Sequence, residues 1–162
     1  MLLAIDSSTS SSGLALYDGL VVRYECIWTS TEFHSVDLAP GIQQALKLVD
    51  LQIKDLKAVA VAIGPGSYTG LRIGLAMAKG LAFSHNLAFI PVPTLDILAA
   101  GQPIQDLPMA AVLQAGRGRL YRRVGGGGET SFSFSRATSL SVIIVYPEAG
   151  TARNCHRSRS PS

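Results

Sequence analysis

The sequence has few charged residues, two cysteines and no long uncharged apolar run. Charged side chains make up 15% of its 162 residues, well below the roughly 25% that is usual for a soluble domain. The hydrophobic share of 48% is ordinary, which excludes a chain that is disordered throughout. No stretch reaches the roughly 18 apolar residues of a membrane helix, and Asp6 interrupts the region where a signal peptide would be apolar. We therefore expect no membrane association.

Sequence patterns that bind metal ions are also missing. Cys26 and Cys155 lie far apart in the sequence, which predicts reduced thiols in a cytoplasmic protein and no zinc site. The histidines are His34, His85 and His156, so none belongs to the four-residue helical pair that is typical of zinc enzymes. We expect no metal ion to be bound by this chain.

Charge is distributed unevenly along the sequence. Residues 1–121 hold eight basic and nine acidic side chains, whereas residues 122–162 hold six arginines, two glutamates, and neither lysine nor aspartate. The second segment also contains four consecutive glycines and an alternating serine and phenylalanine run, with Leu140 to Tyr146 as its one strand-like patch. We interpret residues 122–162 as an aberrant or disordered Gly/Ser/Arg-rich tail. The alternative is an arginine-rich arm that binds nucleic acid.

Hydrophobic periodicity in residues 1–121 predicts an α/β fold with a mixed sheet. Three antiparallel strands come first, with a two-residue turn at Asp18 and Gly19 between the second and the third. Helices and strands then alternate. The predicted strands are Met1 to Ile5, Gly13 to Tyr17, Leu20 to Trp28, Lys57 to Ile63, Leu87 to Val92, and Met109 to Leu113 with a partner near Arg119 to Tyr121. The predicted helices are a segment capped by Ser35, the segment Leu71 to Phe83, and Leu95 to Ala100 capped by Thr94.

The loop from Gly64 to Gly70 lies between a predicted strand and a predicted helix. Glycines allow a tight turn that presents backbone N–H groups at a helix N-terminus, which is an arrangement suited to anions. The spacing matches neither a Walker loop nor a dinucleotide fingerprint, so a turn that packs the helix on the sheet is the simpler interpretation. A polar run follows the first strand, where it either holds a phosphate or caps a turn. The candidate anion or nucleotide contacts are Asp6, Ser7, Gly64, Gly66, Ser67 and Thr69.

Small residues recur every four positions in the second helix. Gly70, Gly74 and Ala78 leave one helical stripe almost without side chains, and such a stripe lets another backbone approach closely. We expect a helix of another subunit to pack there. Tyr68 and Arg72 stand at the start of the same helix, where Tyr68 is either an anchor for a partner or a cover for its own core.

Several segments together resemble one known family. These segments are Leu3 to Thr9, the helix entry His34-Ser35 with Leu38, Pro40 and Ile42, and above all the run from Ala62 to Ala82. They are similar to the TsaB (YeaZ) family, and the similarity covers roughly residues 1–121. The resemblance implies an actin-like ATPase (ribonuclease H-like) fold, with residues 1–105 as the N-terminal domain and 106–121 as the start of a truncated second domain.

The resemblance also implies a function. Members of this family are non-catalytic scaffold subunits in the transfer of threonylcarbamoyl to N6 of adenosine 37 in tRNA. They pair with a TsaD-type catalytic subunit and a TsaE-type ATPase, and a homodimer is possible. ATP and the metal ion are expected on those partner subunits, with tRNA contacted through the complex in the cytoplasm. The implied partner interface comprises His34, Ser35, Leu38, Ile42, Tyr68, Gly70, Leu71, Arg72, Gly74, Leu75 and Ala78.

Three other functions remain open from the sequence. One is an independent actin-like ATPase or phosphotransferase that uses Asp6 and the loop at Gly64. Another is a glycoprotease-like peptidase, as the family has been labelled. The third is direct binding of tRNA by the arginine-rich tail, which would depend steeply on salt concentration.

Overall fold

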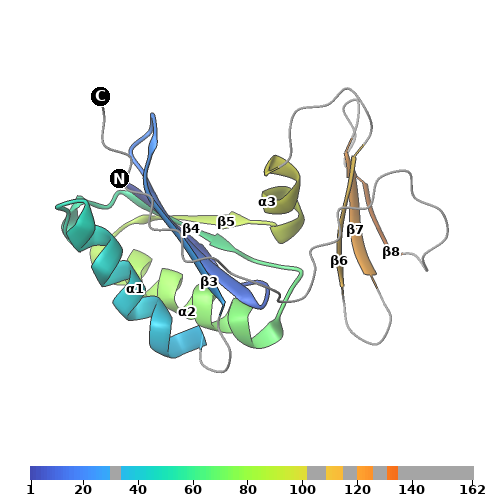
Figure 1. The fold of residues 1–162 in the computed structure, drawn as a ribbon, viewed down its shortest axis with the longest axis horizontal. Helices are drawn as coiled ribbons and strands as arrows, with labels where there is room; N and C mark the ends of the chain where they lie inside the picture. Colours follow the sequence, from blue (N-terminus) through green and yellow to red (C-terminus); the bar gives the residue numbers. More distant parts are fainter. Residues whose placement is uncertain (30–33, 102–108, 115–119, 126–130, 135–162) are drawn as a thin grey trace.

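The first part of the chain folds around a five-stranded mixed sheet (Figure 1). The structure is a computed structural model that describes residues 1–29, 34–101, 109–114, 120–125 and 131–134. Strands β1 (Leu2–Asp6), β2 (Ser11–Tyr17), β3 (Val22–Thr29), β4 (Ala58–Ala62) and β5 (Ala88–Val92) are arranged in the order β3-β2-β1-β4-β5. The first three strands pair antiparallel, while β4 runs parallel to both β1 and β5. The predicted order of elements is confirmed for this sheet.

Two long helices cover one face of the sheet. Helices α1 (His34–Leu48) and α2 (Tyr68–His85) lie beside each other there, and the short 3-10 helix Ile53–Asp55 precedes β4. Alternate residues of the strands point into this layer, so leucine, isoleucine and valine side chains from β1, β2 and β4 form one core with the inner faces of both helices. The core fixes where α2 begins, and therefore fixes the geometry of the loop before it.

A short helix and a second sheet follow on the other side of the first sheet (Figure 1). Helix α3 (Thr94–Ala100) packs against β6 through Leu95, Leu98 and Ala111. Strands β6 (Met109–Gln114), β7 (Leu120–Gly125) and β8 (Ser131–Phe134) form an antiparallel sheet. Regular structure therefore continues past Tyr121, and the expectation that Leu140 to Tyr146 is the one strand-like patch after residue 121 is wrong, because β7 extends to Gly125 and β8 follows it. Leu140 to Tyr146 lies outside the described residues, and the domain boundaries stay a prediction.

Three local expectations about turns and caps need correction. The β2–β3 connection has four residues, because Tyr17 pairs with Val22 and only Gly19 has a positive φ, of 105°. Helix α1 begins at His34, so Ser35 lies within its first turn and does not precede it. The N-cap of α3 is Pro93 and makes no side-chain hydrogen bond. In each case the strand or helix begins or ends at a different residue from the one that the local sequence favours.

Candidate functional site

The polar turn after β1 and the glycine loop after β4 meet at the carboxyl ends of these two strands. Because β1 and β4 are parallel neighbours, the segments that follow them lie at the same edge of the sheet, where open α/β sheets bind ligands. The Ser67 N–H donates to the Ser8 carbonyl at 2.6 Å. The Ser7 hydroxyl donates to the Gly70 carbonyl at 2.8 Å, inside the first turn of α2. The two candidate phosphate-binding segments are therefore bonded directly to each other.

The glycines of α2 are required by this contact. A Cβ atom built on Gly70 would overlap the Ser7 carbonyl oxygen, and one on Gly74 would overlap the Ser7 hydroxyl oxygen. A Cβ on Gly66 would lie 2.9 Å from the Cβ of Ser8. Each of these glycines therefore lets the backbone of β1 and its turn approach closely.

The small-residue stripe of α2 thus faces its own sheet. Gly70, Gly74 and Ala78 are the buried residues of this helix, so the expectation that another subunit's helix packs on them is wrong. The physical reason is that a stripe without side chains allows close approach by any backbone, and here β1 fills the space. Leu38 and Ile42 of α1 are also core residues, 1% and 3% exposed. These five predicted interface residues are therefore buried within their own chain.

Several hydrogen-bonding groups of the loop are already paired with other groups of the same chain. Ser67 is the N-cap of α2, and its hydroxyl accepts the Gly70 N–H at 3.3 Å. The Leu71 N–H donates to the Ser67 carbonyl at 2.9 Å. The Thr94 N–H donates to the Gly64 carbonyl at 2.9 Å, which ties α3 to the same loop. The loop therefore acts as a packing junction, and its use as an anion site stays a prediction.

The electrostatics at this edge of the sheet do not favour a bare phosphate. The carboxylate of Asp6 is partly exposed and accepts the Ser8 N–H at 2.9 Å, and a negative charge there repels an anion. Among the described residues, no group of three histidine, cysteine or acidic side chains could hold a metal ion. Two buried hydroxyls, of Ser8 and Thr94, lack a hydrogen-bond partner in the described part of the chain. A water molecule or a small neutral ligand would satisfy them, but neither hydroxyl supplies charge.

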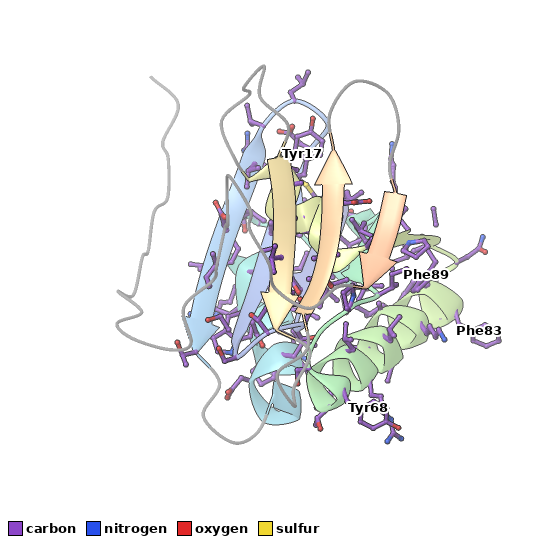
Figure 2. The ribbon with its side chains drawn as sticks, turned by 90° about the vertical axis from the view of Figure 1, so that its right-hand side faces the viewer. Tyr17, Tyr68, Phe83 and Phe89 are labelled. Atoms are coloured by element: carbon purple, nitrogen blue, oxygen red, sulfur yellow. The ribbon has the colours of Figure 1, made fainter. Side chains whose placement is uncertain are left out.

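The outer side of α2 presents large side chains instead. Tyr68 is 75% exposed and Phe83 is 96% exposed, and Figure 2 shows them projecting from opposite ends of the helix. The Arg72 guanidinium lies 5.4 Å from the centroid of the Tyr68 ring, a cation–π arrangement. Lys79 is exposed on the same side. Sequence reasoning missed Lys79 and Phe83, although their spacing from Tyr68 places them opposite the glycine stripe.

The remaining predicted interface residues lie at other positions of the two helices. Leu71 and Leu75 are half-buried along the flank of α2, and His34 and Ser35 lie in the first turn of α1. Leu48, the last residue of α1, is 57% exposed. We use the term outer helical face for Tyr68, Arg72, Lys79 and Phe83 of α2.

Known proteins resemble this chain both in sequence and in fold. A family model described as "TsaD: tRNA N6-adenosine threonylcarbamoyltransferase" matches residues 29–132. The TsaB protein of Bacillus subtilis is 38% identical over 120 residues, which cover 74% of this chain and 52% of that protein. The chain belongs to the TsaB/YeaZ family. The Escherichia coli TsaB is 36% identical over 62% of this chain and 43% of its own length.

The solved structure of YeaZ from Pseudomonas aeruginosa has the same fold. It superposes with a TM-score of 0.71 at 28% identity, covering 84% of this chain and 65% of that chain. The α/β actin-like fold expected for a TsaB/YeaZ chain is therefore confirmed. The chain spans about half the length of the curated TsaB relatives that it matches. In the described part of the chain, no helix has both the length and the apolar character needed to cross a bilayer.

Proposed function

We propose that this chain is a non-catalytic subunit in the biosynthesis of threonylcarbamoyladenosine in tRNA. The relatives at 36–38% identity carry the name "tRNA threonylcarbamoyladenosine biosynthesis protein TsaB", which supports the process. A scaffold role is supported by the hydrogen bonds at the edge of the sheet, where the Ser7 hydroxyl and the Ser67 N–H join the turn after β1 to the loop after β4. A catalytic or nucleotide-binding site needs such groups to remain available for a ligand.

The partner in this proposal is a TsaD-type catalytic subunit, which docks on the outer helical face. Aromatic and arginine side chains are the residue types that most often dominate binding energy at interfaces. Tyr68, Arg72 and Phe83 provide them on one side of one helix, and two of them are at least 75% exposed. The glycine stripe on the opposite side holds α2 rigidly on the sheet, so the outer side chains are presented at fixed positions. ATP and the metal ion would then be bound by the TsaD-type and TsaE-type partners, in the cytoplasm, with tRNA reached through the complex.

Binding to a purified bacterial TsaD-type subunit, measured by isothermal titration calorimetry, tests this proposal. The variant Phe83→Asp combined with Arg72→Glu should weaken binding by at least tenfold. A matched control is Leu20→Asp, because Leu20 is also apolar and 89% exposed but lies in the β2–β3 connection. Gly74→Arg is unsuitable, since Gly74 faces Ser7 and the variant would perturb the fold. Equal affinity of the two surface variants for the catalytic subunit would refute the proposed interface.

A further inference from the structure

Helices α1 and α2 carry their charges in different patterns. Helix α1 has Asp37 in its first turn and Lys47 in its last, which is the arrangement that the helix dipole favours. Helix α2 has no acidic residue, neither in its first turn nor elsewhere. The cations on its outer helical face are Arg72 and Lys79. The positive charge of α2 is therefore not balanced within the helix itself.

The Arg72 guanidinium lies at the N-terminal end of α2. It is 5.4 Å from the centroid of the ring of Tyr68, which is the first residue of the helix. Helical side chains are tilted toward the N-terminus, so an arginine can lie over an aromatic ring four residues before it. A cation at this position is disfavoured by the positive end of the helix dipole. The contact with the Tyr68 ring holds the guanidinium there.

Arg72 has no anionic partner in the described part of its own chain. It forms no ion pair there, whereas Arg23 of β3 lies 3.9 Å from Asp18. The Arg72 side chain is exposed, and stacking on a ring leaves the N–H donors at the edge of a guanidinium available. A side chain that is already oriented loses little conformational freedom when it binds a carboxylate. Charge complementarity therefore favours an acidic partner at this end of α2.

The other end of the outer helical face is apolar. Phe83 is 96% exposed, and Figure 2 shows its ring at the opposite end of α2 from Tyr68. Between the two ends lie Ala76 and Gly80, which are both exposed, and a Cβ atom on Gly80 would meet nothing within 4 Å. The two ends of this face therefore offer different chemistry to a partner, and the small residues between them allow that partner to approach closely.

An RNA partner fits this surface less well than a protein. RNA-binding surfaces neutralise several phosphates with lysine and arginine side chains, whereas Arg72 and Lys79 are seven residues apart on α2, which is about 10 Å along the helix axis. Residues 1–121 hold eight basic and nine acidic side chains, so these residues provide no positive excess. A single oriented arginine is suited to one carboxylate, which it can bind with two parallel hydrogen bonds.

We propose that Arg72 binds a carboxylate of the TsaD-type subunit, so that the partner surface is acidic over Tyr68 and Arg72 and apolar over Phe83. This contact rests on the proposed function, which places that subunit on the outer helical face. Arg72 then determines the orientation of docking, because a reversed partner would leave the guanidinium unpaired and place its acidic side over Phe83. Tyr68 is a positioning residue for the guanidinium.

Calorimetric titration of the full chain with a purified TsaD-type subunit, at several salt concentrations, tests the carboxylate contact. Arg72→Gln should raise the dissociation constant about tenfold at low salt and flatten its dependence on salt concentration. Arg72→Lys keeps the charge but not the fork of donors, so it should restore the salt dependence and only part of the affinity. Arg23→Gln removes an exposed arginine outside α2 and should change neither quantity. Circular dichroism verifies that each variant is folded.

The positioning role of Tyr68 has its own test. Tyr68→Leu keeps an apolar side chain but removes the ring that holds the guanidinium. It should weaken binding in the wild-type background and have a smaller effect when Arg72→Gln is already present, because the two residues act together. Equal effects in the two backgrounds would overturn the positioning role. Phe83→Ala should weaken binding to the same extent at low and high salt, because its contact is apolar.

Failure of the carboxylate contact is distinguishable from failure of the proposed interface. No binding of the wild-type chain to the catalytic subunit would overturn both. Binding that Phe83→Ala weakens, but that neither Arg72→Gln nor salt concentration affects, would overturn the carboxylate contact alone. Binding of labelled tRNA by this chain alone, lost in Arg72→Gln, would overturn it as well, because the guanidinium would then contact a phosphate.

Discussion

The two sides of helix α2 perform different tasks with different residues. The inner side has glycines so close to β1 that a Cβ atom on Gly70 or Gly74 would overlap Ser7. The outer side has Tyr68 and Phe83, which contribute little to the core of their own chain because they are 75% and 96% exposed. The inner side determines where the helix lies, and the outer side offers contacts. A stripe of small residues thus indicates close approach of a backbone, without indicating which backbone.

The largest expected effect is that of a side chain added on the inner side. Gly70→Val should lower the free energy of unfolding by about 3 kcal/mol or more, because backbone atoms of Ser7 occupy the space that the new side chain needs. Gly80 of the same helix is the matched control, since a Cβ atom there meets nothing within 4 Å. Gly80→Ala should instead stabilise the protein by up to about 1 kcal/mol, through helix propensity. Urea unfolding measures both.

A smaller effect is expected from the hydrogen bond that joins β1 to α2. Ser7→Ala should destabilise the protein by about 1 to 2 kcal/mol, because the Ser7 hydroxyl is buried and donates to the Gly70 carbonyl at 2.8 Å. Ser84 makes the same type of bond to the Gly80 carbonyl at 2.7 Å, but in an exposed position. Ser84→Ala should therefore change the stability by less than about 0.5 kcal/mol. Equal losses in the two variants would mean that burial of the Ser7 bond is unimportant.

The order of elements was predictable because each element carries its own local signal. Alternation in β1 and β2, the helical period of α2 and the glycines before it are all features of short sequence windows. Even within these elements one boundary differs from its prediction. The β2–β3 connection has four residues and not two, because the pairing of β2 with β3 ends at Tyr17 and Val22. In contrast, a short sequence window does not show which element packs against a given surface of a helix or strand. Leu38 and Ile42 read equally well as interface or core, and only the position of α1 on β2 shows that they are core.

The strand content beyond Tyr121 was missed for a related reason. The glycines that begin at Gly125 are unfavourable for a strand when they are read alone. In the structure Arg122, Arg123 and Gly125 belong to β7, which pairs with β6 on one side and β8 on the other. Pairing on both sides supplies hydrogen bonds that local propensity does not include. Long-range pairing therefore extended the fold beyond the point where the sequence pattern ended.

The smallest expected effect on stability is on the outer side of α2. Phe83→Ala should change the free energy of unfolding by less than about 0.5 kcal/mol, because the ring is 96% exposed. Leu38→Ala is the informative comparison, since Leu38 was also a predicted interface residue but is 1% exposed. Its loss should cost about 2 to 5 kcal/mol in a urea titration. If Phe83→Ala were as destabilising as Leu38→Ala, the outer side of α2 would be part of the fold, and the contrast between the two sides would fail.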